Sequence, residues 1–243
     1  AAQVTALAQR FAGPLQAVEL FPGANTGAGW GAPPNPEAYA SLYNQVQAQL
    51  QSAGLPLLLV GGGLQPLSTQ AANGDLPDLA FLQRLYQAGA FPAVISVQLT
   101  GVADDPLAAP RTGQPVLRHY EEVRQVMSSV GQEKSVIWIT AFRAASGTIQ
   151  ASGVNSANGQ VQQNASLYQV MAQLRSQLYI GVAFYDSLNP LSIDAAQSAL
   201  IPSDMQYHPY TGVFRELIGQ NGGTTFVSRY GRSKGEGIDK PRP

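Results

Sequence analysis

Short apolar runs, each bounded by Gly, Pro or Asn, recur along the chain and alternate with stretches of helical periodicity. Each run is continuously apolar, a pattern typical of strands that are buried on both faces in parallel sheets. The expected strands are 16–21, 56–60, 93–99, 135–142 and 179–185. The expected helices between them are 36–52, 79–88, 119–130 and 166–177. The pattern predicts an α/β fold with five β/α units.

Local signals place two helix starts and leave the kind of parallel sheet open. Asn35 can cap a helix with Pro36 in its first turn, and Asp78 stands just before the next apolar helical pattern. The run Gly61–Gly63 follows a strand without the glycine spacing of a dinucleotide loop, so we interpret it as a strand-to-loop turn. Strand and helix alternation fits either a doubly wound sheet or a barrel.

Composition narrows the classes of function. The 243 residues are 44% hydrophobic and only 12% charged, with a net charge of −1, which argues against a groove for nucleic acid. Cys is absent and there are two His, so we expect no thiolate or His-based metal site and no cofactor. No apolar run has the roughly 20 residues needed to span a bilayer. The open classes are enzymes and binding or structural proteins.

Two segments carry a resemblance to a known family. Val18–Asn25 reads V-E-L-F-P-G-A-N, and Ile137–Phe142 reads I-W-I-T-A-F. In order and spacing, these segments and the apolar runs around them resemble strands four to eight of the clan A glycoside hydrolases. The resemblance implies a TIM-barrel-like (β/α) repeat over residues 1–222, incomplete or completed by another segment or chain. Residues 223–243, rich in Gly, Pro and basic side chains, read as an extended C-terminal arm.

The positions that the resemblance assigns to catalysis lack catalytic side chains. The acid/base glutamate corresponds to Gly23, the asparagine before it to Pro22, and the nucleophile to Ala141. A retaining glycosidase needs two carboxyl groups about 5 Å apart, one to protonate the leaving oxygen and one to attack the sugar. Neither Gly nor Ala supplies a carboxyl group. We therefore expect a pseudoenzyme with a structural or assembly role.

Other polar and aromatic residues keep two alternatives open. Asp186 and one of Asp104 or Asp105 could act as relocated catalytic carboxylates, although each also fits a turn or a solvated loop. A saccharide-binding module is the other alternative, because aromatic rings stack on sugars and amides bind hydroxyl groups. Its candidate substrate-binding residues are Trp30, Asn25, Gln98 and Tyr185. Glu19 lies within a strand, where we expect a structural hydrogen bond.

The predicted strands imply a partner. Five parallel strands cannot close a barrel, and both edges would expose backbone groups. We therefore expect another protein chain or an upstream segment to cover the missing strands, and carbohydrate as a further candidate ligand. Exported, extracellular or cell-surface location is the expectation that the family resemblance implies.

Overall fold

Five strands form one parallel sheet in the computed structural model. The structure describes residues 1–67, 73–99, 109–110, 116–142 and 168–185. The sheet order is β1-β2-β3-β4-β5, and each neighbouring pair is parallel. The strands are β1 (Ala17–Glu19), β2 (Leu58–Leu64), β3 (Val94–Leu99), β4 (Val136–Phe142) and β5 (Ile180–Tyr185). All five predicted strands are confirmed, with ends that differ by at most four residues.

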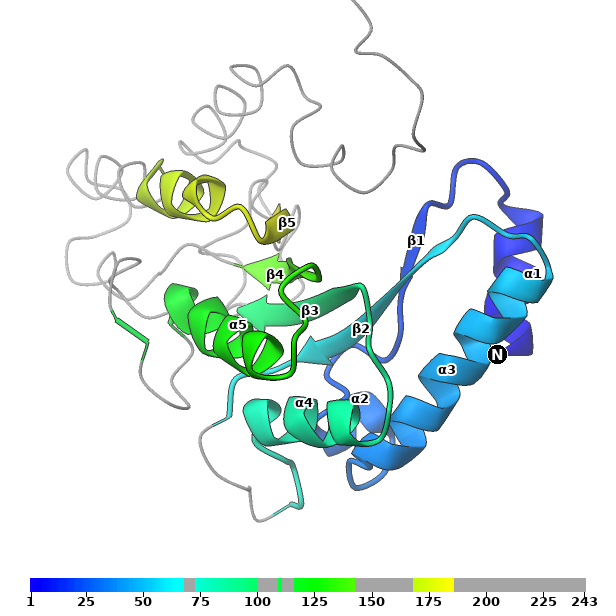
Figure 1. Cartoon of the computed structure of the whole chain (residues 1–243), viewed down its shortest axis with the longest axis horizontal. Coiled ribbons are helices and arrows are strands. Elements are labelled where there is room, and N and C mark those ends of the chain that lie inside the picture. The colour runs from blue at the N-terminus through cyan, green and yellow to red at the C-terminus, as the bar shows by residue number, and fades with distance from the viewer. Residues whose placement is uncertain (68–72, 100–108, 111–115, 143–167, 186–243) are drawn as a thin grey trace, which may run out of the picture.

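Helices connect the strands and lie against one face of the sheet (Figure 1). They are α1 (Ala2–Arg10), α2 (Gly27–Trp30), α3 (Pro36–Ser52), α4 (Asp78–Gln87), the 3-10 helix η1 (Leu117–His119) and α5 (Tyr120–Ser129). Residues 168–176 are also helical. The predicted helix at 36–52 is confirmed at both ends, and the other three are confirmed within about one turn.

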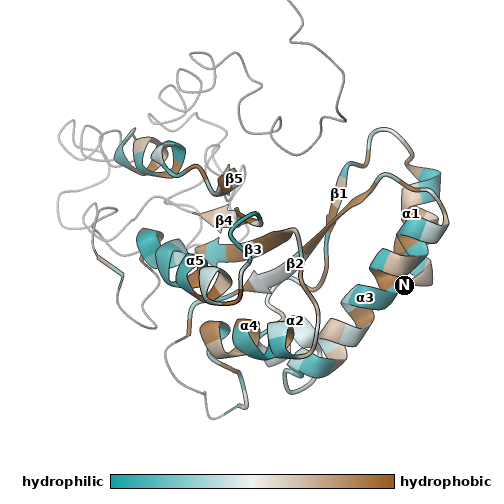
Figure 2. Cartoon of the chain, viewed as in Figure 1, coloured by the Kyte–Doolittle hydropathy of each residue, from teal (hydrophilic) through white to brown (hydrophobic). Residues whose placement is uncertain are grey.

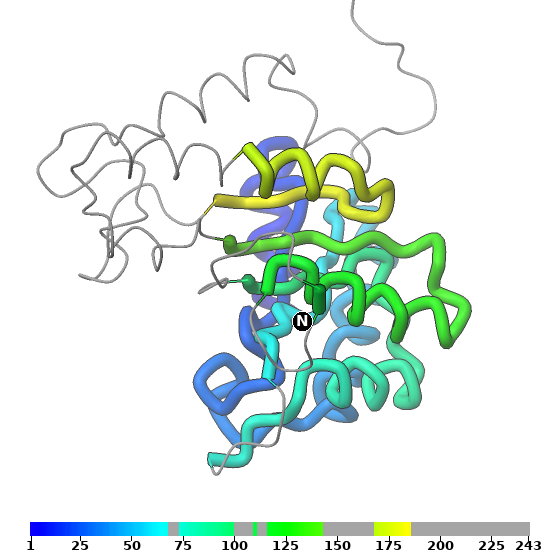
Figure 3. The backbone as a smooth tube through the Cα atoms, turned by 90° about the vertical axis from the view of Figure 1, so that its left-hand side faces the viewer, coloured from blue at the N-terminus to red at the C-terminus, as the bar shows by residue number. Residues whose placement is uncertain are grey.

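The strand order decides between the two parallel architectures. Each strand pairs with the next one along the chain, so the described sheet has no switch point at which the winding reverses. A side-chain hydrogen bond of 3.0 Å joins Thr140 of β4 to Glu19 of β1. Three strand spacings separate these strands, about 14 Å on a flat sheet, so the sheet must curl toward its inner face. The fold is a curled half-barrel of the TIM-barrel-like class, with successive β/α units stacked side by side (Figure 3).

Burial separates the two faces of the sheet. In β4, Ile137 and Ile139 are buried, whereas the alternating residues Val136, Trp138 and Thr140 are partly exposed. The buried side chains pack on the apolar faces of α3, α4 and α5, whose polar faces turn outward (Figure 2). The helices therefore cover the outer face, and the inner face carries the less buried side chains.

Two tyrosines of α3 fasten this helix to the sheet. The Tyr39 hydroxyl donates to the Leu20 carbonyl at 3.0 Å and accepts from the Gly62 N–H at 2.9 Å. The Tyr43 hydroxyl donates to the Leu59 carbonyl at 3.3 Å. Burial raises the pKa of Tyr43 to about 12 and raises that of Tyr39 further. Both hydroxyls therefore stay neutral and act as structural hydrogen-bonding groups.

One local prediction is wrong and another needs adjustment. Asn35 caps α3 as expected, accepting from the Ala38 N–H at 2.9 Å. Asp78, expected just before α4, is its first residue. The run Gly61–Gly63 lies inside β2 and is not a strand-to-loop turn. A side chain does not fit at Gly63, because a Cβ there would lie 2.6 Å from the Pro22 Cα. Gly61 and Gly62 are likewise crowded, by Pro92 and Ser96, so glycines are required at this part of β2.

The described sheet ends at β1 on one side and at β5 on the other. No further strand pairs with either of them within the described ranges. On the β5 side, Leu178 is 75% exposed and Phe184 is 48% exposed. Among the helices that the structure describes, none is long and apolar enough to cross a membrane.

Candidate functional site

The candidate site lies where the strands end at their carboxyl termini. In β/α barrels this edge carries the chemistry, because the loops after the strands converge there. A hydrogen bond from Thr140 to Glu19 joins the ends of β4 and β1 here, and Gln98 at the end of β3 pairs with Ala141 of β4. The residues that follow β1 and β2, Gly23 and Gln65, complete the described part of the site.

Glu19 and Thr140 form the contact that spans the site. The Thr140 hydroxyl donates to Glu19 Oε1 at 3.0 Å, and both side chains are partly exposed. A shift in register between β3 and β4 positions the threonine: Val97 pairs with Ile139, but the next residue, Gln98, pairs with Ala141. Thr140 is therefore the extra residue of a bulge, a feature that often re-aims side chains near sites. The expected structural hydrogen bond of Glu19 is confirmed.

A pair of amides lines the neighbouring part of the site. Gln65 Nε2 donates to Gln98 Oε1 at 3.0 Å, which joins the segment after β2 to the end of β3. A Cβ built on Gly23 would lie 3.0 Å from the same Gln65 nitrogen. The described polar groups here are one carboxylate, one hydroxyl and two amides, a set that suits the hydroxyl groups of a neutral ligand.

Gly23 occupies the position that the family resemblance assigns to the acid/base glutamate. Its φ of 78° lies in the left-handed region, which disfavours side chains with a Cβ. Its N–H donates to the Gly63 carbonyl at 2.6 Å, and a Cβ would meet Thr26 Oγ1 at 3.2 Å. The nearest backbone atom, the Gly29 Cα, would lie 3.5 Å from the Gly23 Cβ. A side chain at position 23 is therefore disfavoured by the left-handed backbone and by the neighbouring side chains of Gln65 and Thr26.

Ala141 occupies the position assigned to the nucleophile, and its surroundings differ. It lies within β4, pairs with Gln98 and is partly exposed. Its backbone has no positive φ, since Phe21 is the one non-glycine residue with a positive φ in the described chain. The backbone at this position is thus compatible with a larger side chain.

Asn25, a predicted substrate-binding residue, is fully buried and ties two segments together. Its Nδ2 donates to the carbonyls of Gln65 and Leu76, both at 2.9 Å. Its Oδ1 accepts from the Gln65 N–H at 2.8 Å. These contacts use both amide hydrogens, so the geometry assigns Asn25 a structural role at the β1 end of the site.

Trp30, another predicted binding residue, belongs to a row of aromatic rings. Its ring centroid lies 4.9 Å from that of Phe21 and 5.9 Å from that of Tyr39. It ends the short helix α2, whose cap Thr26 accepts from the Gly29 N–H at 3.1 Å. Phe21, which the sequence analysis did not single out, has a φ of 51° and remains partly exposed beside it. Strain of this kind at a non-glycine residue clusters near functional sites.

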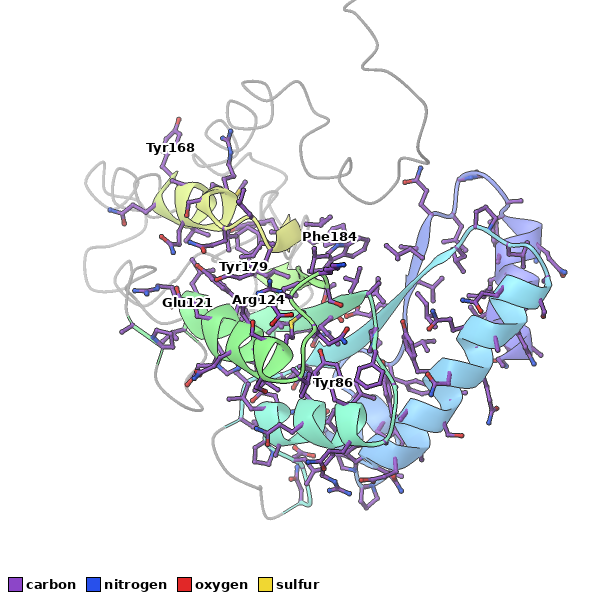
Figure 4. All side chains as sticks on the ribbon, in the orientation of Figure 1. Tyr86, Glu121, Arg124, Tyr168, Tyr179 and Phe184 are labelled. Atoms are coloured by element: carbon purple, nitrogen blue, oxygen red, sulfur yellow. The ribbon has the colours of Figure 1, made fainter. Side chains whose placement is uncertain are left out.

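Tyr185, the last aromatic residue predicted to bind substrate, lies at the β4–β5 side of the sheet. Tyr185 packs edge-on against Phe142, with ring centroids 5.3 Å apart, and lies partly buried against the hydrophobic core. Phe184 lies beside Trp138 at 6.1 Å and projects from the end of β5 (Figure 4). The Trp138 indole nitrogen is buried against Gly181 without a hydrogen-bond partner. Phe184 and Trp138 are therefore better placed for stacking than Tyr185.

Sequence reasoning missed the residues that depend on three-dimensional proximity. Gln65 lies in no motif, and Phe21 and Thr140 lie in the two family-like segments without being assigned a role; only the curl and the bulge bring Thr140 to Glu19. The carboxylate candidates Asp104, Asp105 and Asp186 lie outside the described residues. Within the described ranges, no group of three or more His, Asp or Glu side chains is arranged to hold a metal ion.

Comparisons with known proteins agree with the fold. No family model matches the sequence, and no curated protein sequence matches it. The structure is similar to a GH128 (subgroup II) endo-β-1,3-glucanase from Sorangium cellulosum, with a TM-score of 0.61 and 16% identity over 88% of this chain and 74% of that one. A GH128 (subgroup III) curdlan-specific exo-β-1,3-glucanase from Blastomyces gilchristii matches with a TM-score of 0.43 and 14% identity over 76% and 66% of the two chains. The first likeness establishes a glycoside-hydrolase-like fold for this chain.

Proposed function

We propose that this chain is a non-catalytic, glycoside-hydrolase-like protein that acts as a structural or assembly subunit of an exported or cell-surface complex. The observation that carries the proposal is the backbone at Gly23. Gly23 carries no carboxyl group, and its left-handed φ, together with contacts of 3.0 and 3.2 Å between a Cβ there and the side chains of Gln65 and Thr26, disfavours a general acid at the end of β1. Ala141 lacks the second carboxyl group, so acid/base chemistry and nucleophilic attack both lose their side chains.

The half-barrel supports an assembly role. Parallel sheets are stable when both faces and both edges are covered, and the described sheet ends at β1 and β5. Apolar side chains stay exposed at the β5 end, Leu178 and Phe184 among them. Strands from another protein chain or from an upstream segment would pair with these edges and extend the barrel.

Hydrodynamic and unfolding measurements test the assembly role. The 243-residue chain alone should self-associate or unfold without cooperativity, and it should gain a cooperative transition when a partner or upstream segment is supplied. Size-exclusion chromatography with light scattering and calorimetry report both properties. A stable, compact monomer with a cooperative transition contradicts the assembly role, but leaves the non-catalytic assignment intact.

The inner face of the sheet favours a second candidate function, which is saccharide binding without cleavage. Glu19, Thr140 and Gln98 offer hydrogen bonds to hydroxyl groups, and Phe184 offers a partly exposed ring next to Trp138. Since the similar Sorangium protein is named an endo-β-1,3-glucanase, β-1,3-linked glucose oligosaccharides are the first ligands to test.

Calorimetric titration with oligosaccharides distinguishes the two candidates. Binding by the inner face should weaken in Phe184→Ala by about 1 to 3 kcal/mol if the ring stacks on a sugar. Trp30→Ala is the second variant, and its effect on folding must be measured in parallel because Trp30 packs on Tyr39. Leu178→Ala, at an exposed position before β5, serves as the control. Absence of binding by all glycans removes the saccharide-binding candidate.

A further inference from the structure

His119 is a fully buried histidine held between two carboxylates. Its Nε2 lies 2.5 Å from Asp78 Oδ2, and its Nδ1 lies 2.8 Å from Glu122 Oε2. The exposed fractions of the His119 and Asp78 side chains are 0% and 1%. His119 ends η1, Asp78 begins α4, and Glu122 lies in the first turn of α5. The cluster therefore joins three separate helical elements behind the sheet.

Proton counting identifies the form of this cluster. A neutral imidazole carries a single N–H, whereas two carboxylate oxygens at these distances call for a donor on each ring nitrogen. The cluster accordingly holds one proton more than a neutral histidine with two carboxylates. Burial on its own would lower the pKa of His119, but the hydrogen bond and charge of Asp78, together with those of Glu122, outweigh it and raise this pKa.

The other charged side chains near His119 interact with groups other than His119. Arg118 of η1 pairs with Glu121 at 2.6 Å, and Arg84 of α4 pairs with Glu37 of α3 at 2.8 Å. Arg124 of α5 donates to the carbonyls of Ser135 and Glu133. Among the residues described around η1, α4 and α5, Asp78 and Glu122 are the charged groups that act on His119.

Asp78 extends the cluster toward the candidate site. Its second oxygen, Oδ1, accepts from the Leu67 N–H at 3.1 Å. Leu67 lies two residues after Gln65. The Gln65 side chain donates to Gln98, and the Gln65 N–H donates to the side chain of the buried Asn25. The hydrogen bonds thus run from His119 through Asp78 to the segment after β2 that lines the site.

We propose that His119 is a pH-controlled clamp, whose bound proton fixes η1 and α5 to α4 and to the segment after β2. Loss of that proton leaves a ring nitrogen lone pair facing a carboxylate in a buried place, which repels. A raised pKa in the folded state sets the sign of the effect. The stabilisation is complete below the ordinary value of 6.5 and is lost as the pH rises through the higher folded value.

Nitrogen-detected NMR of the full chain tests the clamp directly. The sequence holds two histidines, His119 and His208. In the variant His208→Gln, every histidine ring signal therefore comes from His119. In this variant the His119 ring should titrate with a midpoint above 6.5, and both ring nitrogens should be protonated below that midpoint. A midpoint at or below 6.5 overturns the proposal.

Thermal unfolding against pH tests the mechanical consequence. The melting temperature of the His208→Gln protein should fall by several degrees between pH 6 and pH 9, and adding Glu122→Gln should flatten much of that fall. Glu121→Gln, the same change one residue away in a partly exposed ion pair, is the matched control and should keep the pH dependence. Equal pH dependence in the two variants refutes the clamp. If Glu122→Gln does not fold at any pH, the NMR midpoint decides.

Discussion

The two positions that the family resemblance assigns to catalysis, Gly23 after β1 and Ala141 in β4, differ in their backbone. Gly23 has a left-handed φ and donates to the Gly63 carbonyl at 2.6 Å, and a Cβ there would lie 3.0 Å from the Gln65 side chain. Ala141 lies in a strand without a positive φ and is partly exposed.

This difference implies that the two positions differ in how easily they would accept a glutamate side chain. A glutamate at position 141 needs only room at the partly exposed inner face. A glutamate at position 23 needs a different path of the chain between β1 and α2. The β1 end is therefore the less tolerant of the two positions, and the following variants probe it.

The largest effect is expected from Gly29→Ala. A Cβ there would lie 2.2 Å from the Gly23 oxygen and 2.4 Å from the Pro22 oxygen, and backbone atoms cannot move aside cheaply. We expect a loss of about 3 kcal/mol or more in the free energy of unfolding, measured by urea denaturation. Gly31→Ala is the control: its φ is 80° but nothing lies within 4 Å, so only strain of about 1 to 2 kcal/mol applies. Equal losses would show that close packing at the β1 end is not the constraint.

Asn25→Ala should follow in size. The change leaves two carbonyls and the Gln65 N–H without the partners that the buried amide supplies. A loss of about 2 to 3 kcal/mol is expected from chemical denaturation, because unsatisfied buried groups cost more than the bonds themselves contribute. Asn44→Ala removes a single exposed amide contact to the Gly89 carbonyl and should change stability by less than about 0.5 kcal/mol. A small effect of Asn25→Ala would weaken the case that this end of the sheet is rigid.

Gly23→Glu compared with Ala141→Glu tests the comparison most sharply. The first change should cost about 2 to 3 kcal/mol, from left-handed strain and the contacts with Gln65 and Thr26. The second should cost about 1 kcal/mol or less, because Ala141 is partly exposed. Differential scanning calorimetry of the two variants gives the order directly. Reversal of that order would mean that the β1 end can accommodate the acid after all.

A smaller effect than those of the glycine and asparagine variants at the β1 end is expected from Thr140→Val. It keeps the shape of the side chain and removes the hydrogen bond to Glu19, so about 0.5 to 1.5 kcal/mol of stability should be lost. Glu19→Gln keeps an acceptor and should cost less. If Thr140→Val is as costly as Gly29→Ala, the bridge between β1 and β4 matters more to this fold than the packing after β1.

Much of the fold could be predicted because its signals are local. Continuous apolar runs marked the five strands, and Asn35 with Pro36 marked the start of α3. The placement of Gly61–Gly63 inside β2 could not be predicted, because it depends on how closely Pro22 approaches this strand. The curl of the sheet depends likewise on contacts between strands that are far apart in the sequence.

The candidate site was less accessible to sequence reasoning. The family resemblance pointed to Gly23 and Ala141, but it did not predict the left-handed backbone that distinguishes Gly23 from Ala141. Asn25 was expected to bind a ligand because its amide suits hydroxyl groups, while the structure commits that amide to backbone carbonyls. His119 was counted only as one of two histidines, since its two carboxylate partners come from α4 and α5.

The measurement that tests the central claim most directly is turnover of glycosides by the unaltered chain. Activated aryl glycosides of several sugars report weak hydrolysis because their leaving groups need little protonation, and β-1,3-linked glucose oligosaccharides test the linkage named for the similar Sorangium protein. The account predicts release no faster than in the absence of protein. Enzymes typically accelerate such reactions by 10⁶-fold or more, so an active site would be plain. Turnover that disappears in Asp186→Asn, Asp104→Asn or Glu19→Gln while folding is retained would contradict the account.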